Sequence, residues 1–111
     1  MRHSQALRTR ASVFAALGDA TRLSVLAELS HGEPRSIARL TAGTSLTRQA
    51  VTKHLRVLSD AGVVHSLRSG RESLYQMKPE PLAAARDFLD QVSRQWDERL
   101  ARLKAHVEGR E

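Results

Sequence analysis

Residues 47–60 carry the side chains whose types and spacing could do chemistry in this sequence. On a helix, with about 100° between successive residues, this segment separates into two faces. Val51, Leu55 and Leu58 lie on the apolar face, and no carboxylate interrupts the other face before Asp60. Three cations on one helix face repel one another unless a negative partner lies against them. This polar face consists of Arg48, Gln49, Thr52, Lys53 and Arg56.

The polar face has the chemistry of a surface that binds bases and phosphates. Arg can bond O6 and N7 of guanine, Gln can bond adenine, and Thr and Lys suit phosphates or thymine methyl groups. A helix also fits the width of the major groove of B-DNA. We therefore predict a DNA-binding helix; the alternative is a solvated surface without a partner. The DNA-binding residues predicted on this segment are Thr47, Arg48, Gln49, Thr52, Lys53 and Arg56.

The segment that follows predicts a β-hairpin. Two short β-type runs within residues 63–77 surround Ser69-Gly70, a pair typical of a tight turn. Arg68 and Arg71 flank this pair and are expected to lie nearly opposite each other. Like charges so placed cost up to about 1 kcal/mol, and a phosphate between them would turn repulsion into attraction. Both arginines are predicted to bind DNA; the alternative is an exposed tip with incidental arginines.

The positive charge of the chain is concentrated in its middle. The formal net charge is +6; residues 31–78 hold eight Arg/Lys against three Asp/Glu, whereas residues 79–111 hold six against seven. A basic segment favours a polyanionic partner through attraction and release of condensed counterions. The absence of Cys excludes disulfides, thiolate catalysis and thiolate metal sites. No G-x-S-x-G, H-E-x-x-H or glycine-rich phosphate loop occurs, so an enzyme is disfavoured.

The N-terminal segment alternates charged and apolar side chains and lacks the continuous apolar run of a signal peptide. No stretch of the sequence approaches the ~20 apolar residues that a membrane span needs. We therefore expect a cytoplasmic protein that has no membrane partner.

Apolar spacing and turn residues predict one domain, residues 1–111, that is mostly α with a small β-hairpin. Asp19 and Thr47 suit the N-caps of the second and fourth helices, and Gly62 suits the end of the fourth. The expected order of elements is α-α-α-α-β-β-α. The helices are expected at residues 4–17, 20–31, 35–42, 47–60 and 82–108.

The predicted last helix carries an apolar seam that one small domain cannot cover. Its apolar side chains recur every three or four residues along a helix roughly 40 Å long. We expect the seam and the first helix to form a two-fold dimer; the alternative is a helix folded back on its own domain. Trp96 is expected to fill this interface rather than to stack on a base. The predicted interface residues are Leu7, Phe14, Leu89, Val92, Trp96, Leu100 and Leu103.

His54 lies within the apolar face of the helix at residues 47–60. A buried histidine there could be a ligand or a pH sensor, but no second ligand stands beside it. We predict a core histidine whose hydrogen bonds are satisfied.

Three stretches together resemble the ArsR/SmtB family of bacterial winged helix-turn-helix repressors. They are VFAALGDATRLSVLAEL, RQAVTKHLRVLSDAGVV and RSGRESLYQM. The resemblance implies a homodimeric transcriptional repressor, with residues 47–60 as the recognition helix, residues 63–77 as the wing, and the terminal helices in the dimer. Two recognition helices about 34 Å apart would reach successive major grooves, so we expect an inverted-repeat operator in double-stranded DNA.

Many members of this family sense metals. Their Cys-containing site would fall in RSIARLTAGT, which has neither Cys nor His. Their other common site uses Asp-x-His and His-x-x-Glu on the final helix, a spacing that the acidic residues and histidine of this helix do not match. We therefore expect no metal and no cofactor, and no effector is identified. The alternatives are a ligand- or metal-responsive repressor of the same fold and a winged-helix module that binds another protein. The residues with unmatched spacing are Asp87, Asp90, His106 and Glu108.

Overall fold

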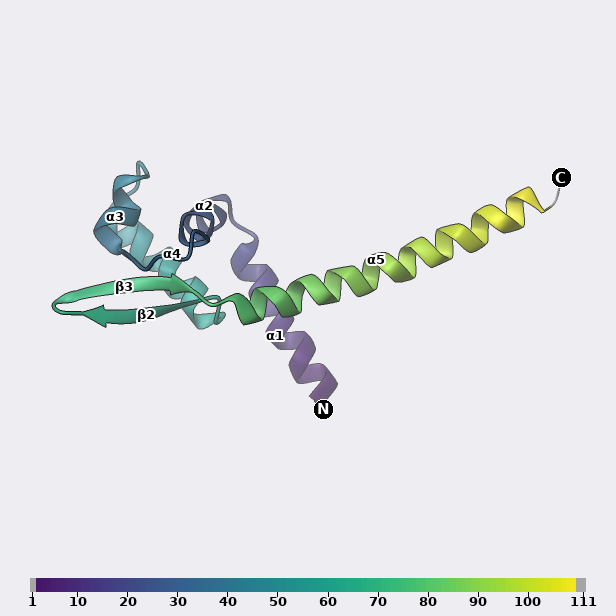
Figure 1. Cartoon of the computed structure of the whole chain (residues 1–111), viewed down its shortest axis with the longest axis horizontal. Coiled ribbons are helices and arrows are strands. Elements are labelled where there is room, and N and C mark those ends of the chain that lie inside the picture. The colour runs from purple at the N-terminus through teal and green to yellow at the C-terminus, as the bar shows by residue number, and fades with distance from the viewer. Residues whose placement is uncertain (1, 110–111) are drawn as a thin grey trace.

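The computed structural model describes residues 2–109, with side chains from Gln5 onward. Helices and a three-stranded antiparallel sheet make up this region, so the predicted mostly α architecture with a small hairpin is confirmed. The hairpin projects from one side of the molecule, and the long last helix projects from the other (Figure 1). The elements are α1 (Arg2–Leu17), α2 (Ala20–Leu29), β1 (Arg35–Ser36), α3 (Ile37–Ala42), α4 (Arg48–Asp60), β2 (Val64–Ser69), β3 (Glu72–Met77) and α5 (Pro79–Glu108).

Two helices start where the sequence supplies a capping residue. The Asp19 carboxylate accepts a 2.9 Å hydrogen bond from the Arg22 backbone N–H, and Thr47 Oγ1 accepts one of 3.1 Å from the N–H of Ala50. Each oxygen satisfies an N–H group that the first turn of a helix leaves without a partner. Both predicted N-caps are therefore confirmed.

Strand β1 corrects the sequence prediction. Arg35 and Ser36, expected as the start of a helix, are extended and pair with β3 instead. Ser36 is the N-cap of α3 and has an extended backbone (φ −75°, ψ 160°), so α3 begins only at Ile37. The two extended residues reach the open edge of β3 and give the strand order β1-β3-β2.

The turn of the hairpin lies one residue later than predicted. Ser69 pairs with Glu72, so the two-residue loop is Gly70-Arg71. Gly70 adopts φ +62°, which glycine takes without steric cost, and it holds the first loop position as in a type II′ turn. Arg68 therefore lies opposite a serine of β3, and the prediction that Arg68 and Arg71 lie opposite each other is wrong.

Helix boundaries also differ in α1, which begins at Arg2 rather than at residue 4, and in two further helices. Helix α5 begins at Pro79 rather than at residue 82, because proline is tolerated in a first turn, whose N–H groups have no intrahelical partner. Helix α2 ends at Leu29 rather than at residue 31. The backbone N–H of Ser30 bonds to carbonyl groups of the last turn and caps this end.

The core lies between α1, α2, α4 and the base of the hairpin. Val51, Leu55 and Leu58 are fully buried, which confirms the apolar face of α4, whereas Val57 on the same face is 40% exposed. Burial of this face fixes which side of α4 is directed to solvent. The buried apolar side chains are Val13, Ala16, Val25, Leu26, Leu29, Leu40, Val51, Leu55, Leu58, Val63, Val64 and Ala85.

Helix α5 extends far beyond this core, and the described region measures 70 × 35 × 21 Å. Near its start, the rings of Phe88 and Phe14 of α1 lie 6.0 Å apart, and the Arg10 guanidinium lies 5.5 Å from the Phe88 ring. Residues 89–108 are all exposed, so the helix is not folded back on its own domain. Within residues 2–109, no helix combines the length and apolarity of a membrane span.

Candidate nucleic-acid interface

The polar face of α4 is directed to solvent. Arg48, Gln49, Lys53 and Arg56 are exposed, and Thr52 is half-buried. Thr52 Oγ1 donates a 2.7 Å hydrogen bond to the Arg48 carbonyl, so this hydroxyl is occupied within the helix. The long side chains of the polar face extend outward and are available to a partner.

Thr47 stands at the N-terminal end of this face and is also exposed. Its oxygen already accepts the capping hydrogen bond from Ala50, but the hydroxyl proton remains available. Thr47 can therefore cap α4 and donate to a phosphate at the same time.

The cations of the polar face have no acidic partner in the part of the chain with described side chains. Three ion pairs within 4.0 Å occur there, and none involves a side chain of this face. The head groups of Arg48, Lys53 and Arg56 also make no hydrogen bond to the described residues. The surface therefore carries positive charge that a polyanion could neutralise.

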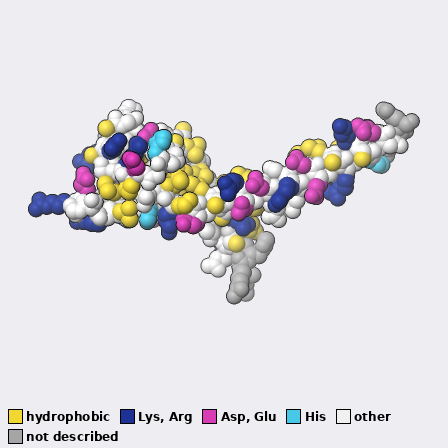
Figure 2. Space-filling view, in the orientation of Figure 1, with side chains coloured by type: hydrophobic (Ala, Val, Ile, Leu, Met, Phe, Trp, Pro, Cys, Tyr) yellow, Lys and Arg dark blue, Asp and Glu magenta, His cyan; other side chains and the backbone are white. Residues whose placement is uncertain are grey.

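The wing adds two further exposed cations. Arg68 lies on β2 near its end, and Arg71 lies in the loop. Lys and Arg side chains gather at the outer tip of the hairpin (Figure 2). A basic tip of this kind suits contacts with phosphate oxygens.

The wing and the helix meet at one cleft of about 270 Å³. Arg48 contributes to it from the start of α4, and Arg71 and Glu72 contribute from the hairpin. The other lining residues come from the start of α3 and from β3. The structure thus brings Arg48 and Arg71 together, whereas the rest of the polar face lies farther along α4, outside the cleft.

Comparison with known proteins bears on what this surface binds. A model described as a helix-turn-helix domain matches residues 17–66. The chain is 43% identical over 77 residues to YuzN, an uncharacterised HTH-type transcriptional regulator of Bacillus subtilis; the alignment covers 64% of this chain and 84% of YuzN. An ArsR-like transcriptional regulator from Rhodococcus sp. matches with a TM-score of 0.77 and 38% identity, over 88% of this chain and 92% of that one. The chain belongs to the ArsR/SmtB family.

A further structural match agrees with this assignment. The homodimeric winged helix-turn-helix DNA-binding domain of Mb0332 from Mycobacterium bovis has a TM-score of 0.68 and 28% identity, over 89% of this chain and 88% of that one. The predicted family and winged helix-turn-helix fold are confirmed. As a member of the ArsR/SmtB family, the protein is a DNA-binding transcriptional regulator.

The potential metal-ligating side chains in the described part of this regulator do not form a cluster of three or more. Within it, no three His, Cys, Asp or Glu side chains come together in a way that could hold a metal ion. The acidic residues and histidine of α5 are all exposed along the projecting helix.

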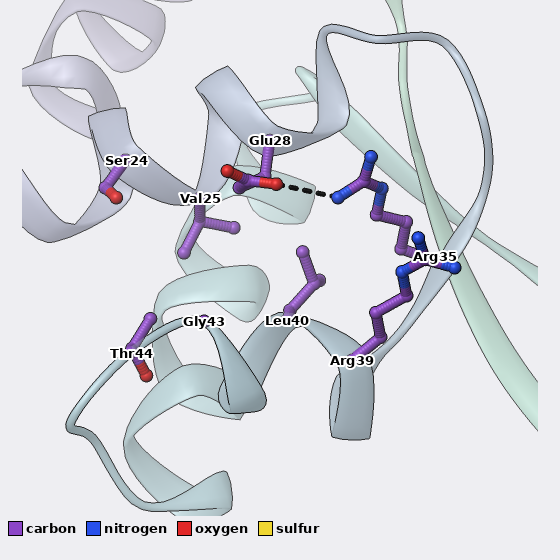
Figure 3. Close-up of a pocket in the computed structure, with 8 residues that line it drawn as sticks. All are labelled: Ser24, Val25, Glu28, Arg35, Arg39, Leu40, Gly43 and Thr44. Carbon is purple, nitrogen blue, oxygen red and sulfur yellow. Dashed lines mark hydrogen bonds and ion pairs between the residues drawn. The ribbon is translucent and has the colours of Figure 1, made fainter.

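A partly open cavity of about 100 Å³ lies between α2, β1 and α3 (Figure 3). Arg35 Nη1 donates a 2.7 Å hydrogen bond to the Glu28 carboxylate at its rim, and Val25 and Leu40 form its apolar wall. The buried Nε of Arg35 has no hydrogen-bond partner among the described residues. The Glu28–Arg35 pair joins α2 to the sheet that carries the wing. Sequence reasoning missed it, because a loop separates the two residues and leaves no periodic signal.

His54 occupies a different position from the one predicted. Its side chain is 23% exposed, and Nδ1 lies 3.5 Å from Arg22 Nη1 and 3.8 Å from Asp19 Oδ2. The prediction of polar partners is confirmed, but His54 lies at the edge of the core because it faces the N-terminus of α2. Neither partner was identified from the sequence.

The side chains predicted to form the dimer are mostly exposed. Leu7 on α1 is 39% exposed, and those of the α5 seam range from 45% to 59%. Phe14 differs, because it is half-buried against Phe88 of its own chain. An apolar stripe of this extent on a regulator marks an interaction surface. The exposed seam comprises Leu89, Val92, Trp96, Leu100, Leu103 and Val107.

Proposed function

We propose that this ArsR/SmtB regulator is a homodimeric repressor that binds an inverted-repeat operator through α4 and the wing. The observation that carries the proposal is the polar face of α4, which is exposed and has no acidic partner among the described residues. DNA phosphates would neutralise its cations, and base edges would bond its guanidinium and amide groups.

The helix and the wing have different roles in this proposal. Side chains on α4 enter the major groove and contact base edges, whereas the wing tip contacts phosphate or the minor groove. The shared cleft between Arg48 and Arg71 supports simultaneous contact by both elements. The groove contacts are assigned to Thr47, Arg48, Gln49, Thr52, Lys53 and Arg56, and the wing contacts to Arg68 and Arg71.

Dimerisation follows in this proposal from the exposed seam of α5 and from Leu7 of α1. Residues 1–111 act as one domain whose terminal helices pair with those of a second copy. A two-fold dimer presents two recognition helices about 34 Å apart, which reach successive major grooves on one side of the duplex. Such a dimer on its operator would block transcription from that site.

Selection of bound fragments from a random duplex pool at near-physiological salt tests this proposal. We expect enrichment of an inverted repeat with half-sites one helical turn apart. If each subunit neutralises about four phosphates, log affinity should fall with log salt concentration with a slope of about −7. A pool without enrichment, together with salt-independent binding to an acidic protein, would instead support a winged-helix module for protein partners.

A further inference from the structure

Arg22 of α2 reaches back to the C-terminal end of α1. Its Nε donates a 2.6 Å hydrogen bond to the Ala16 carbonyl, and Nη2 donates one of 3.3 Å to the Ala15 carbonyl. The last carbonyls of a helix have no intrahelical partner and carry the negative end of its dipole. One guanidinium therefore caps α1 and fixes the junction between α1 and α2.

The remaining nitrogen of the same guanidinium faces α4. Arg22 Nη1 lies 3.5 Å from His54 Nδ1, near the middle of α4. Asp19 Oδ2 accepts the Arg22 backbone N–H at 2.9 Å and lies 3.8 Å from the same ring nitrogen. With its proton on Nε2, the neutral imidazole accepts from Arg22. Arg22 therefore links α4 to the end of α1 through directional polar contacts.

Such a contact would refine the orientation of α4 that the burial of its apolar face sets. Val51, Leu55 and Leu58 bury one face of α4, but apolar contacts are non-directional. His54 stands next to Lys53 and two residues before Arg56, so the rotation of α4 that places His54 also sets the direction of the polar face. Groups that bind a partner must be held to within about 0.5 Å and 10–20°.

We infer that Arg22 is a positioning residue that couples α1 to the DNA-binding orientation of α4 through His54. The inference rests on the proposed function, in which α1 contributes to the dimer and α4 contacts base edges. Dimerisation and operator binding would then be linked through one guanidinium rather than through the core alone.

Replacement of His54 tests the inference with a matched pair of variants. Asn places a polar atom near the position of Nδ1, whereas Leu fills similar space without an acceptor. We expect His54→Leu to weaken operator binding about tenfold, with the melting temperature and dimer dissociation constant close to those of the parent protein. His54→Asn should stay within about threefold of the parent. His31→Leu, at an exposed position outside the junction, should have no effect.

A second variant keeps the inference testable if His54→Leu does not fold. Arg22→Lys retains the charge but cannot bond two α1 carbonyls and His54 together, so we expect operator binding to weaken about tenfold. Parent-like affinity of Arg22→Lys, or of a folded His54→Leu, would overturn the inference. If Arg48→Ala also binds like the parent, the assignment of α4 itself has failed; if only Arg48→Ala weakens binding, the coupling alone has failed.

Discussion

Arg48, at the start of α4, and Arg71, in the loop of the hairpin, line the same cleft. Glu72 lines it as well, yet no ion pair within 4.0 Å joins Glu72 to either arginine among the described residues. In the proposed function, these two cations on separate elements would contact a duplex from two directions. Their different positions predict different effects of substitution.

Arg48→Ala should relax base preference, whereas Arg71→Ala should weaken binding to all duplexes alike. Loss of an arginine that bonds a base costs about 1–3 kcal/mol at the affected base pair. Loss of a phosphate contact lowers the magnitude of the salt slope by about 1. Titrations of the selected operator and of scrambled duplexes at several salt concentrations measure both effects.

Lys104→Ala is the control for these substitutions, because it removes one positive charge from the far end of α5. It should leave the affinity and the salt slope unchanged. If neither Arg48→Ala nor Arg71→Ala alters operator binding, the assignment of these surfaces is wrong.

The N-cap of α4 predicts a stability effect. Thr47→Ala removes the oxygen that accepts the Ala50 N–H at 3.1 Å, so the free energy of unfolding should fall by about 1 kcal/mol. Thr47→Ser retains the oxygen and should lie close to the parent protein. Urea denaturation compares the three proteins, and equal loss in both variants would mean that capping is not the cause.

Local signals in the sequence predicted the N-caps of α2 and α4, the buried face of α4 and the exposure of its polar face. Asp19 and Thr47 bond N–H groups only three residues away, and Val51, Leu55 and Leu58 follow the helical period. Features of this kind depend on residues within one or two turns of each other. They can therefore be found without knowledge of the tertiary structure.

The features that were missed depend on residues far apart in the sequence. Arg22 and His54 are 32 positions apart, and the pairing of β1 with β3 joins segments that the whole of α3 and α4 separates. The hairpin turn was misplaced for another reason. Both Ser69-Gly70 and Gly70-Arg71 satisfy the turn preference for glycine, and only the strand pairing distinguishes them.

Asp19 predicts a specific dependence of stability on pH. The Arg22 backbone N–H lowers the pKa of Asp19 below its ordinary value of 3.8; partial desolvation opposes this, and the Arg22 and His54 charges assist it. Because the folded-state pKa is the lower one, ionised Asp19 stabilises the fold above about pH 4. That stabilisation is lost as the pH falls through the folded-state pKa.

Asp19→Asn should therefore be less stable than the parent protein at pH 7, although Asn still caps the helix. The difference in the free energy of unfolding should shrink as the pH falls below about 4. Denaturant titrations of both proteins between pH 7 and pH 2 measure this difference. A difference that stays constant across the range would show that the carboxylate charge is not its source.

Zinc should leave operator binding unchanged. The described residues contain no cluster of three metal-ligating side chains, and the chain has no Cys. Calorimetric titration with zinc should give no saturable heat, and a chelator should not change operator affinity. Tight zinc binding that alters operator affinity would instead support a metal-responsive repressor.

The seam of α5 predicts the oligomeric state. Leu100 lies within the seam and is 45% exposed, so a second copy must cover it if the regulator is a dimer. Leu100→Glu would place a charge in that interface and should convert the dimer to a monomer. Operator affinity should fall by at least tenfold, because a monomer contacts one half-site. Sedimentation equilibrium and operator titration measure the two effects.

Arg99→Glu is the matched control, since it introduces the same carboxylate one residue away, outside the apolar seam. This variant should remain a dimer, although its net charge falls by more than that of Leu100→Glu. Dissociation of both variants would point to general charge repulsion along α5. A dimeric Leu100→Glu would show that the seam is not the interface.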